Sequence, residues 1–184
     1  MQQALRTLWT VGHSTRSLDE LADLLRARGI TTLVDVRRFA GSRRNPQFSG
    51  ESLARELPAE GIDYVAMPDL GGRREPRDEA ASSTWRNAAF RGYAQYMATP
   101  AYARARARLA ALASAQPVAV MCAEGAWRQC HRSLISDDFK AAGWTVLHIA
   151  APGQAEEHPY TDAARIENGR LTYAPPADAQ GSLF

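Results

Sequence analysis

Residues 118–132 read VAVMCAEGAWRQCHR, and this stretch decides how the rest of the chain is interpreted. A short apolar run follows Pro117, and its β-branched and small residues are typical of a buried strand. The run ends at Cys122, and a helix is expected to begin at His131. Two thiols, a carboxylate, an imidazole and a guanidinium therefore fall in one strand-to-helix connection. In open α/β sheets, ligands bind at such connections, beside the carboxyl ends of the strands.

Strand and helix patterns alternate along the chain on both sides of this stretch. Strands are expected at residues 7–11, 31–36, 62–67, 118–121 and 145–149, and helices at 18–28, 51–60, 93–97, 102–115 and 131–142. This alternation predicts the α/β class, in a single domain of the Rossmann-like, three-layer kind. Its sheet would be mostly parallel and five-stranded, with helices on both faces. We assign residues 1–150 to this α/β domain, and residues 151–184 to an extension with a flexible tail that is not a separate domain.

The composition limits the class of protein. A chain of 184 residues and 20.1 kDa is expected to form one domain with a full core. No apolar run approaches the length of a membrane span, and the first residues do not resemble a secretory signal. We therefore expect a cytoplasmic protein without a membrane partner, whose two cysteines are reduced. The net charge is +2, and Lys140 is the only lysine. Arginine supplies the positive charge, and its planar fork suits phosphate and carboxylate.

Polar clusters follow three of the predicted strands. His13 and Ser14 follow the first, Asp35 and Arg37 the second, and Cys122 the fourth. If these strands are parallel, the clusters meet at one edge of the sheet. The candidate catalytic residues there are His13, Asp35, Cys122, Glu124, Cys130 and His131.

The two thiols leave several chemical interpretations open. Positive partial charge at a helix N-terminus lowers a thiol pKa and favours a thiolate, which acts as a nucleophile or a metal ligand. Zinc would use Cys122, Cys130 and His131, with His13 as a further donor, although the cysteine spacing matches no standard finger. The spacing from Cys122 to Arg128 is similar to the phosphate loop of cysteine phosphatases and rhodaneses. The triplet at 130–132 resembles the core of alkylguanine-DNA alkyltransferases. A buried structural cysteine is the remaining alternative.

A basic loop at residues 37–48 carries arginines between aromatic residues. Arginines contact phosphates and aromatic rings stack on bases, so the loop is a candidate nucleic-acid contact. The alternative is a solvated charged loop. The candidate substrate-binding residues are Ser14, Arg37, Ser42, Arg43, Arg44, Asn45, Phe48 and Arg132. A long irregular segment at residues 69–90 repeats the arginine–aromatic pattern and is a candidate binding loop.

The last five residues read QGSLF and resemble the bacterial sliding-clamp-binding peptide. Gln180, Leu183 and Phe184 occupy the matching positions. An apolar pair on a polar tether is explained by a pocket on a partner protein. The alternative is a tail that folds back onto the domain.

Several motifs occur in order along the chain and together resemble one family. They are TVGHST at 10–15, LVDVR at 33–37, SRRNPQF at 42–48, LGG at 70–72, CAE at 122–124 and CHR at 130–132. From about residue 8 to 149, this pattern is similar to the bacterial domain-of-unknown-function family 488. The resemblance implies an α/β domain and places the motif residues at the predicted sheet edge. It does not require an arginine at position 128, which weakens the phosphatase interpretation.

The leading hypothesis from these observations is a cytoplasmic enzyme that acts on nucleic acid, in DNA repair, recruited by the sliding clamp. A cysteine would be nucleophile or ligand, and Glu124 and His131 would transfer protons. One alternative is a small-molecule thiol enzyme of the phosphatase or rhodanese kind. Another is a non-catalytic adaptor that binds DNA and the clamp. The sequence requires no cofactor, and zinc is the metal it would accommodate.

Overall fold

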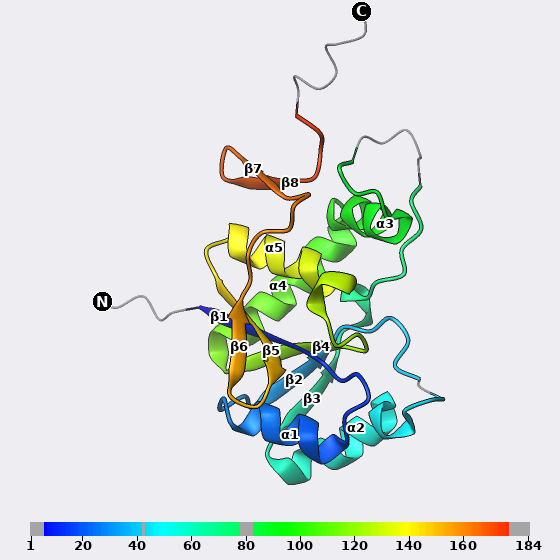
Figure 1. Cartoon of the computed structure of the whole chain (residues 1–184), viewed down its shortest axis with the longest axis vertical. Coiled ribbons are helices and arrows are strands. Elements are labelled where there is room, and N and C mark those ends of the chain that lie inside the picture. Colours follow the sequence, from blue (N-terminus) through cyan, green and yellow to red (C-terminus); the bar gives the residue numbers. More distant parts are fainter. Residues whose placement is uncertain (1–5, 42, 78–82, 177–184) are drawn as a thin grey trace, which may run out of the picture.

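The fold is built on one six-stranded sheet, seen in a computed structural model that describes residues 6–41, 43–77 and 83–176. The strand order is β3-β2-β4-β1-β5-β6 (Figure 1). These strands are β1 (Thr7–Gly12), β2 (Thr32–Asp35), β3 (Asp63–Ala66), β4 (Val118–Cys122), β5 (Thr145–Ala151) and β6 (Gln154–Glu157). The first five are parallel, and β6 runs antiparallel to β5 at the sheet edge.

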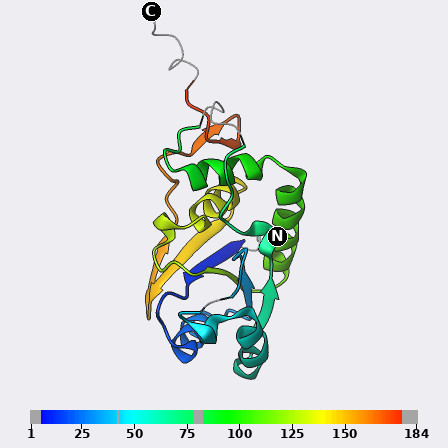
Figure 2. The same cartoon turned by 90° about the vertical axis from the view of Figure 1, so that its right-hand side faces the viewer.

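Helices cover both faces of the sheet. The helices are α1 (Leu18–Arg26), α2 (Gly50–Glu56), α3 (Ala88–Met97), α4 (Pro100–Ala115) and α5 (Arg132–Ala141), with 3-10 turns η1 (Pro46–Phe48), η2 (Leu57–Glu60), η3 (Pro68–Leu70) and η4 (Trp127–Gln129). Helices α1 and α2 lie on one face, while α4 and α5 lie on the other with α3 beyond them (Figures 1 and 2). The predicted single-domain, three-layer α/β fold is confirmed. Among the described helices, none has the length and apolar character needed to cross a bilayer.

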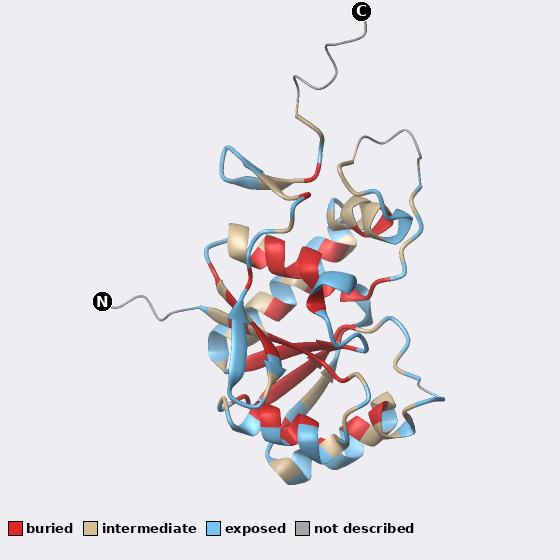
Figure 3. Ribbon diagram, viewed as in Figure 1, coloured by how far each residue is buried: buried red, intermediate tan, exposed pale blue. Residues whose placement is uncertain are grey.

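Strand β4 is the central strand of this arrangement, and all five of its residues are buried (Figure 3). Successive side chains of a strand point to opposite faces. Val120 and Cys122 therefore join the core shared with α4 and α5. Ala119 and Met121 join the core shared with α1 and α2. The alternation turns the Cys122 thiol toward α5, at the carboxyl end of the strand.

Helix α1 shows how the local sequence fixes an element. The Ser17 hydroxyl accepts from the Glu20 N–H (3.1 Å), and the Glu20 carboxylate accepts from the Ser17 N–H (2.6 Å). This is a capping box, which satisfies amides at the start of the helix. Leu21, Leu24 and Leu25 are buried on its inner face. The capping box and this apolar face determine where α1 begins and how it packs.

Three elements differ from the sequence-based prediction. Strand β6 was not expected because all four of its residues are exposed, so no apolar alternation signals it. Helix α3 begins five residues earlier than predicted, because the Asn87 side chain accepts from the Ala89 N–H (2.8 Å) and caps it. The predicted C-terminal extension contains a separate hairpin of β7 (Arg165–Glu167) and β8 (Arg170–Thr172).

The strand order determines where the polar clusters lie. Strand β4 lies between β2 and β1, so the three strands that precede the predicted site residues are immediate neighbours. The backbone joins their ends. The N–H of His13 donates to the Cys122 carbonyl (3.0 Å), and the N–H of Val36 donates to the Met121 carbonyl (3.0 Å).

Candidate active site

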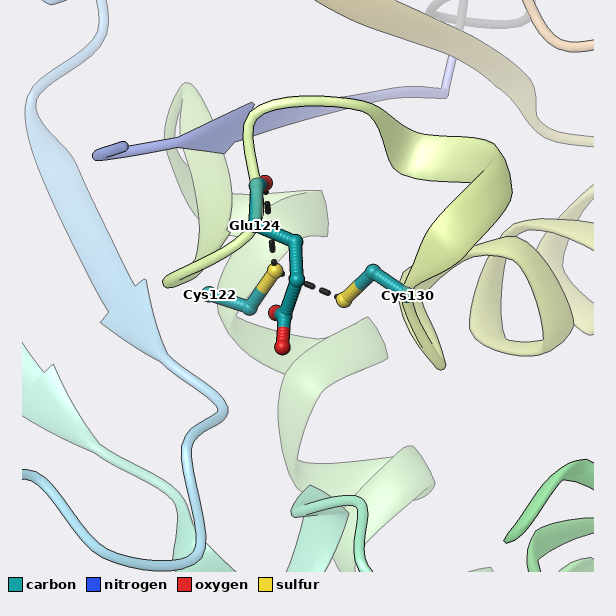
Figure 4. A group of neighbouring side chains, drawn as sticks. All are labelled: Cys122, Glu124 and Cys130. Carbon is teal, nitrogen blue, oxygen red and sulfur yellow. Dashed lines mark hydrogen bonds between the residues drawn. The ribbon is translucent and has the colours of Figure 1, made fainter. Parts of the chain in front are cut away.

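Two thiols form the centre of the site. The Cys122 and Cys130 sulfur atoms lie 2.6 Å apart, and both cysteines are free and buried. One thiol comes from the end of β4 and the other from the residue after η4. Figure 4 shows the two sulfur atoms facing each other, with Glu124 beside them. One sulfur donates a hydrogen bond to the other.

Arg132, the first residue of α5, holds the pair in place. Its Nε donates to the Cys122 sulfur (2.9 Å), and its Nη2 donates to the carbonyl of Glu124 (2.6 Å). Nη1 donates to the Thr10 hydroxyl (3.2 Å). Arg132 is only 1% exposed. Its guanidinium therefore binds the Cys122 sulfur and the loop after β4. It is not accessible for the substrate contact that the sequence predicted.

His131 completes the arrangement around Cys130. Its Nε2 lies 3.1 Å from the Val36 carbonyl, and its Nδ1 lies 3.5 Å from the Cys130 sulfur. A carbonyl only accepts, so Nε2 carries the hydrogen and the Nδ1 of a neutral ring is free to accept the Cys130 proton. The Arg132 backbone N–H also points at the Cys130 sulfur (3.4 Å). These contacts make a cysteine–histidine pair whose imidazole is oriented by a main-chain group.

The two thiols differ in acidity. Burial raises the pKa of Cys122, and the neighbouring Cys130 raises it further. Burial acts in the same sense on Cys130, but its hydrogen bonds with Cys122 and His131, together with the Arg132 charge, outweigh it and lower the pKa of Cys130. Cys130 is therefore the thiol that loses its proton more readily, and Cys122 the one that keeps it.

Glycines of the motifs allow the backbone to approach the site. A Cβ on Gly72 would lie 2.8 Å from His131 Nδ1, and one on Gly12 would lie 1.9 Å from the Glu124 carbonyl oxygen. Both are closer than side-chain atoms tolerate. The Tyr93 ring also packs near the imidazole, with centroids 5.2 Å apart. His131 thus lies close to both a glycine and an aromatic ring.

A second polar group lies at the ends of β1 and β2. The Arg37 guanidinium donates to both Asp35 carboxylate oxygens (2.8 and 2.6 Å) and to the Phe48 carbonyl (2.7 Å). The Tyr64 hydroxyl donates to the same carboxylate (2.7 Å). Asp35 is only 1% exposed, so it positions Arg37 and does not reach the solvent side of the site.

His13, the remaining catalytic candidate after β1, also faces Arg37. Its Nδ1 lies 2.9 Å from the Ser14 carbonyl and its Nε2 lies 3.3 Å from Arg37 Nη1. Burial, the largest cause, lowers the pKa of His13, and the Arg37 charge lowers it further. The imidazole stacks on the buried Phe48 ring at 4.3 Å. The His13 ring and the Phe48 carbonyl therefore both contact the Arg37 guanidinium.

Two cavities open over these groups. The inner one, about 250 Å³, is lined by Cys122, Cys130, His131 and Tyr93, among other residues. The outer one, about 530 Å³, is lined by residues that include His13, Ser14, Thr15, Arg37, Phe39, Gly41, Arg43, Arg44, Asn45, Arg73 and Glu124. Arg37, Phe39, Gly41, Arg73, Ala123 and Glu124 line both. The two cavities therefore form one cleft with a cationic entrance and a thiol at its inner end. Arg73 belongs to the candidate binding loop predicted from the sequence, whereas sequence reasoning missed Tyr93 and Gln129 as lining residues.

A further cavity, about 550 Å³, lies elsewhere, between α3, α4, α5 and the β7–β8 hairpin. Its lining includes none of the predicted site residues. Arg128 is also directed away from the thiols, because its guanidinium pairs with Glu156 on β6 (2.7 Å). The phosphatase-type loop is therefore not closed by this arginine. Ser42, Gln180, Leu183 and Phe184 lie outside the described residues.

The two thiols and the neighbouring Glu124 carboxylate are also a candidate metal site. Ligand atoms of Cys122, Glu124 and Cys130 lie within 4.8 Å of one another. Zinc–sulfur bonds of about 2.3 Å in a tetrahedron would separate two sulfurs by about 3.8 Å, whereas these are 2.6 Å apart. Arg132 already places a permanent positive charge on Cys122. His131, the predicted third ligand, is committed to Val36 and Cys130. The arrangement fits a hydrogen-bonded thiol pair better than a zinc centre.

The fold and the site define an α/β protein with a thiol pair at the carboxyl edge of its sheet. A family model described as a domain of unknown function, DUF488, matches residues 17–138. The chain therefore belongs to the DUF488 family, as the sequence motifs predicted. No curated protein and no solved structure matches the chain. The matched range includes both cysteines and the arginine loop, and β1 precedes it.

Proposed function

We propose that this protein is a thiol-dependent enzyme that acts on nucleic acid, with Cys130 as the nucleophile. The observation that carries this proposal is the continuity of the cleft, in which arginines lead directly to the thiols. Arg43, Arg44 and Arg73 form no ion pair within the described residues. Glu124 is the only acidic residue among the described lining of both cavities. Such an entrance attracts a polyanion.

The lining favours a nucleotide over a simple anion. Phe39 is 65% exposed, lies within 5.5 Å of the Arg38 guanidinium, and lines both cavities. An exposed ring between cations is suited to stack on a base while arginines hold the phosphates. The inner cavity is lined by Phe90 and Tyr93 and by the amide of Gln129. We infer that one unstacked nucleotide enters it, as enzymes that act on bases require.

The chemistry begins with a proton transfer within the site. The Cys130 proton passes to His131 Nδ1, and the resulting thiolate is stabilised by the Cys122 S–H and the Arg132 N–H. The sulfur lone pair then forms a bond with an electrophilic atom of the nucleotide. The bond to the leaving group breaks, the leaving group takes the electron pair, and the His131 imidazolium returns the proton to it. Glu124, exposed at the junction of the cavities, exchanges protons with solvent.

Binding is tested with fluorescent single-stranded and duplex DNA over a range of salt concentrations. The double variant Arg43→Gln/Arg44→Gln should weaken binding and reduce the salt slope by about 0.7 to 0.9 for each phosphate that is no longer neutralised. The control, Arg104→Gln/Arg108→Gln, removes the same charge from exposed positions of α4 outside the cleft. Equal effects of the two double variants, or binding that ignores salt, would contradict the proposal.

The thiol step is tested by mass spectrometry after incubation with intact and damaged DNA. A covalent adduct should appear on Cys130 and be absent in Cys130→Ser. DNA binding without an adduct, unchanged in Cys130→Ser, would instead indicate a non-catalytic adaptor. Turnover of an aryl phosphate or thiosulfate without DNA binding would instead indicate a small-molecule thiol enzyme.

We further propose that the enzyme works in the cytoplasm in DNA repair and is recruited by the bacterial sliding clamp. The support is the terminal peptide, which follows the described residues. The full chain should comigrate with a purified clamp in size-exclusion chromatography. The variant Leu183→Ala/Phe184→Ala should not. Comigration of both chains would refute recruitment through this peptide and leave the proposal for the cleft unaffected.

A further inference from the structure

A second buried polar group connects to the thiols from the far side of Arg132. The Thr10 hydroxyl, which accepts from Arg132, lies 2.6 Å from His148 Nδ1. His148 Nε2 lies 2.9 Å from His158 Nδ1, and His158 Nε2 lies 2.9 Å from an Asp137 carboxylate oxygen. Each of these residues is at most 2% exposed. An unbroken series of hydrogen bonds therefore joins Asp137 to the Cys122 sulfur.

The direction of every bond in this series follows from its two ends. The Asp137 carboxylate only accepts, so His158 Nε2 carries a hydrogen and the Nδ1 of the neutral ring accepts. His148 Nε2 must then donate to it, which leaves His148 Nδ1 to accept from the Thr10 hydroxyl. The Thr10 oxygen is in turn free to accept from Arg132. With both imidazoles neutral, all donors and acceptors agree only in this one orientation.

The surroundings keep the His148 imidazole neutral. Burial, followed by the neighbouring His158 and the Arg132 charge, lowers the pKa of His148 to about 2. Arg128 is the other charged group that acts on it. The Trp127 indole stacks flat on His148 (4.4 Å, 11°) and meets His158 edge-on (4.9 Å), which covers both rings. Asp137 also accepts from the Thr161 hydroxyl (2.6 Å) and the Tyr173 hydroxyl (2.9 Å).

We infer that Thr10, His148, His158 and Asp137 are positioning residues that hold the Arg132 guanidinium against the thiol pair. Without the Thr10 oxygen, Nη1 of a fully buried cation would lack its partner, and the fork would turn away from Cys122. Asp137 at the far end fixes the tautomer of His158, and through it that of His148. This inference rests on the proposed function only in taking Cys130 as the reactive thiol. It extends the site to the C-terminal segment, where His158, Thr161 and Tyr173 contact Asp137.

The test measures thiol reactivity and needs no substrate. Wild-type and variant proteins are alkylated with iodoacetamide from acid to alkaline pH, and trypsin cleavage after Arg128 then separates the two cysteines for mass spectrometry. Thr10→Val keeps the shape and removes the hydroxyl, and Thr10→Ser restores it. Asp137→Asn removes the charge at the far end. Asp138→Asn is the matched control, because the carboxylate of Asp138 does not belong to the series and pairs instead with Arg106 on α4 (2.7 Å).

Thr10→Val and Asp137→Asn should move the pH profile of Cys130 alkylation upward by about one unit, which slows the reaction about tenfold at pH values below the native pKa of Cys130. Thr10→Ser and Asp138→Asn should stay close to wild type. If Asp137→Asn does not fold, the Thr10 pair decides the result. Folded Thr10→Val with wild-type kinetics would overturn the inference. A DNA adduct that persists in that case would leave the proposed function standing. Altered alkylation without any adduct would refute the proposed function alone.

Discussion

The substitution Gly72→Ala isolates the contribution of His131 to the site. The new methyl group would lie 2.8 Å from Nδ1 and 3.0 Å from Cγ of the imidazole. Since ordinary contact begins near 3.4 Å, the ring must move by several tenths of an ångström. The Tyr93 ring, whose centroid lies 5.2 Å from that of the imidazole, limits the room for that movement. The displacement weakens the bond from Nε2 to the Val36 carbonyl and turns Nδ1 away from Cys130.

The expected effect on stability is small and the effect on reactivity is large. A weakened hydrogen bond costs about 0.5 to 1.5 kcal/mol, and replacing glycine in the unfolded chain offsets about 0.4 to 1 kcal/mol of this. The free energy of unfolding in urea should therefore change by about 1 kcal/mol or less. Loss of the imidazole as proton acceptor should raise the pKa of Cys130 by about one unit, which slows its alkylation about tenfold at pH values below the native pKa.

The matched control is Gly41→Ala, because Gly41 lines the inner cavity as Gly72 does, and a Cβ on Gly41 would meet nothing within 4 Å. Alkylation rates of Cys130 are compared in the two variants and the wild type, beside urea unfolding curves. Equal rates in all three proteins, with Gly72→Ala folded, would refute the assignment of His131 as the proton acceptor for Cys130.

Three further predictions follow from the same geometry. Arg132→Met leaves the Glu124 carbonyl and the Thr10 hydroxyl without a buried donor and should cost about 3 to 5 kcal/mol in urea unfolding, so a loss below about 1 kcal/mol would contradict the role given to this cation. The native pKa of His148 is lowered to about 2 from 6.5, so below pH 6.5 the unfolded chain binds one more proton than the folded chain. The free energy of unfolding should therefore fall by about 1.4 kcal/mol for each unit that the pH drops below 6.5, and His148→Gln should remove that slope. The lowered pKa of Cys130 contributes stability above the unfolded thiol value of about 8.5 that is lost as the pH falls through the native pKa, so Cys130→Ala should cost more at pH 8.5 than at pH 6.

The C-terminal segment takes part in the site more directly than its composition indicates. Strand β6 supplies Glu156, which holds the side chains of Trp127 (3.3 Å) and Arg128 (2.7 Å) from the loop after β4. His158 and Tyr173 meet Asp137 on α5. Residues beyond the family match therefore contact the loop between the two cysteines and the helix α5 that follows it. Truncation after β5 would remove these interactions.

The sequence by itself determined the five parallel strands, most of the helices and the edge of the sheet where polar residues gather. These features follow from short-range patterns. Apolar runs identify buried strands, Ser17 and Glu20 fix the start of α1, and parallel strands with helical crossovers bring their carboxyl ends to one edge. The family motifs lie at this edge, so their residues could be identified before the packing was known.

The tertiary structure alone decided the role of each residue. Arg132 and Asp35 resemble substrate contacts or catalysts in the sequence, yet both are buried and hold other site residues. His148 and His158 lie outside every recognised motif, and the hydrogen bond between His148 and Thr10 joins positions 138 residues apart. Side-chain roles depend on distance, burial and the available donor, which are properties of packing between elements. Local sequence patterns determine the elements, but only their packing determines which atoms meet.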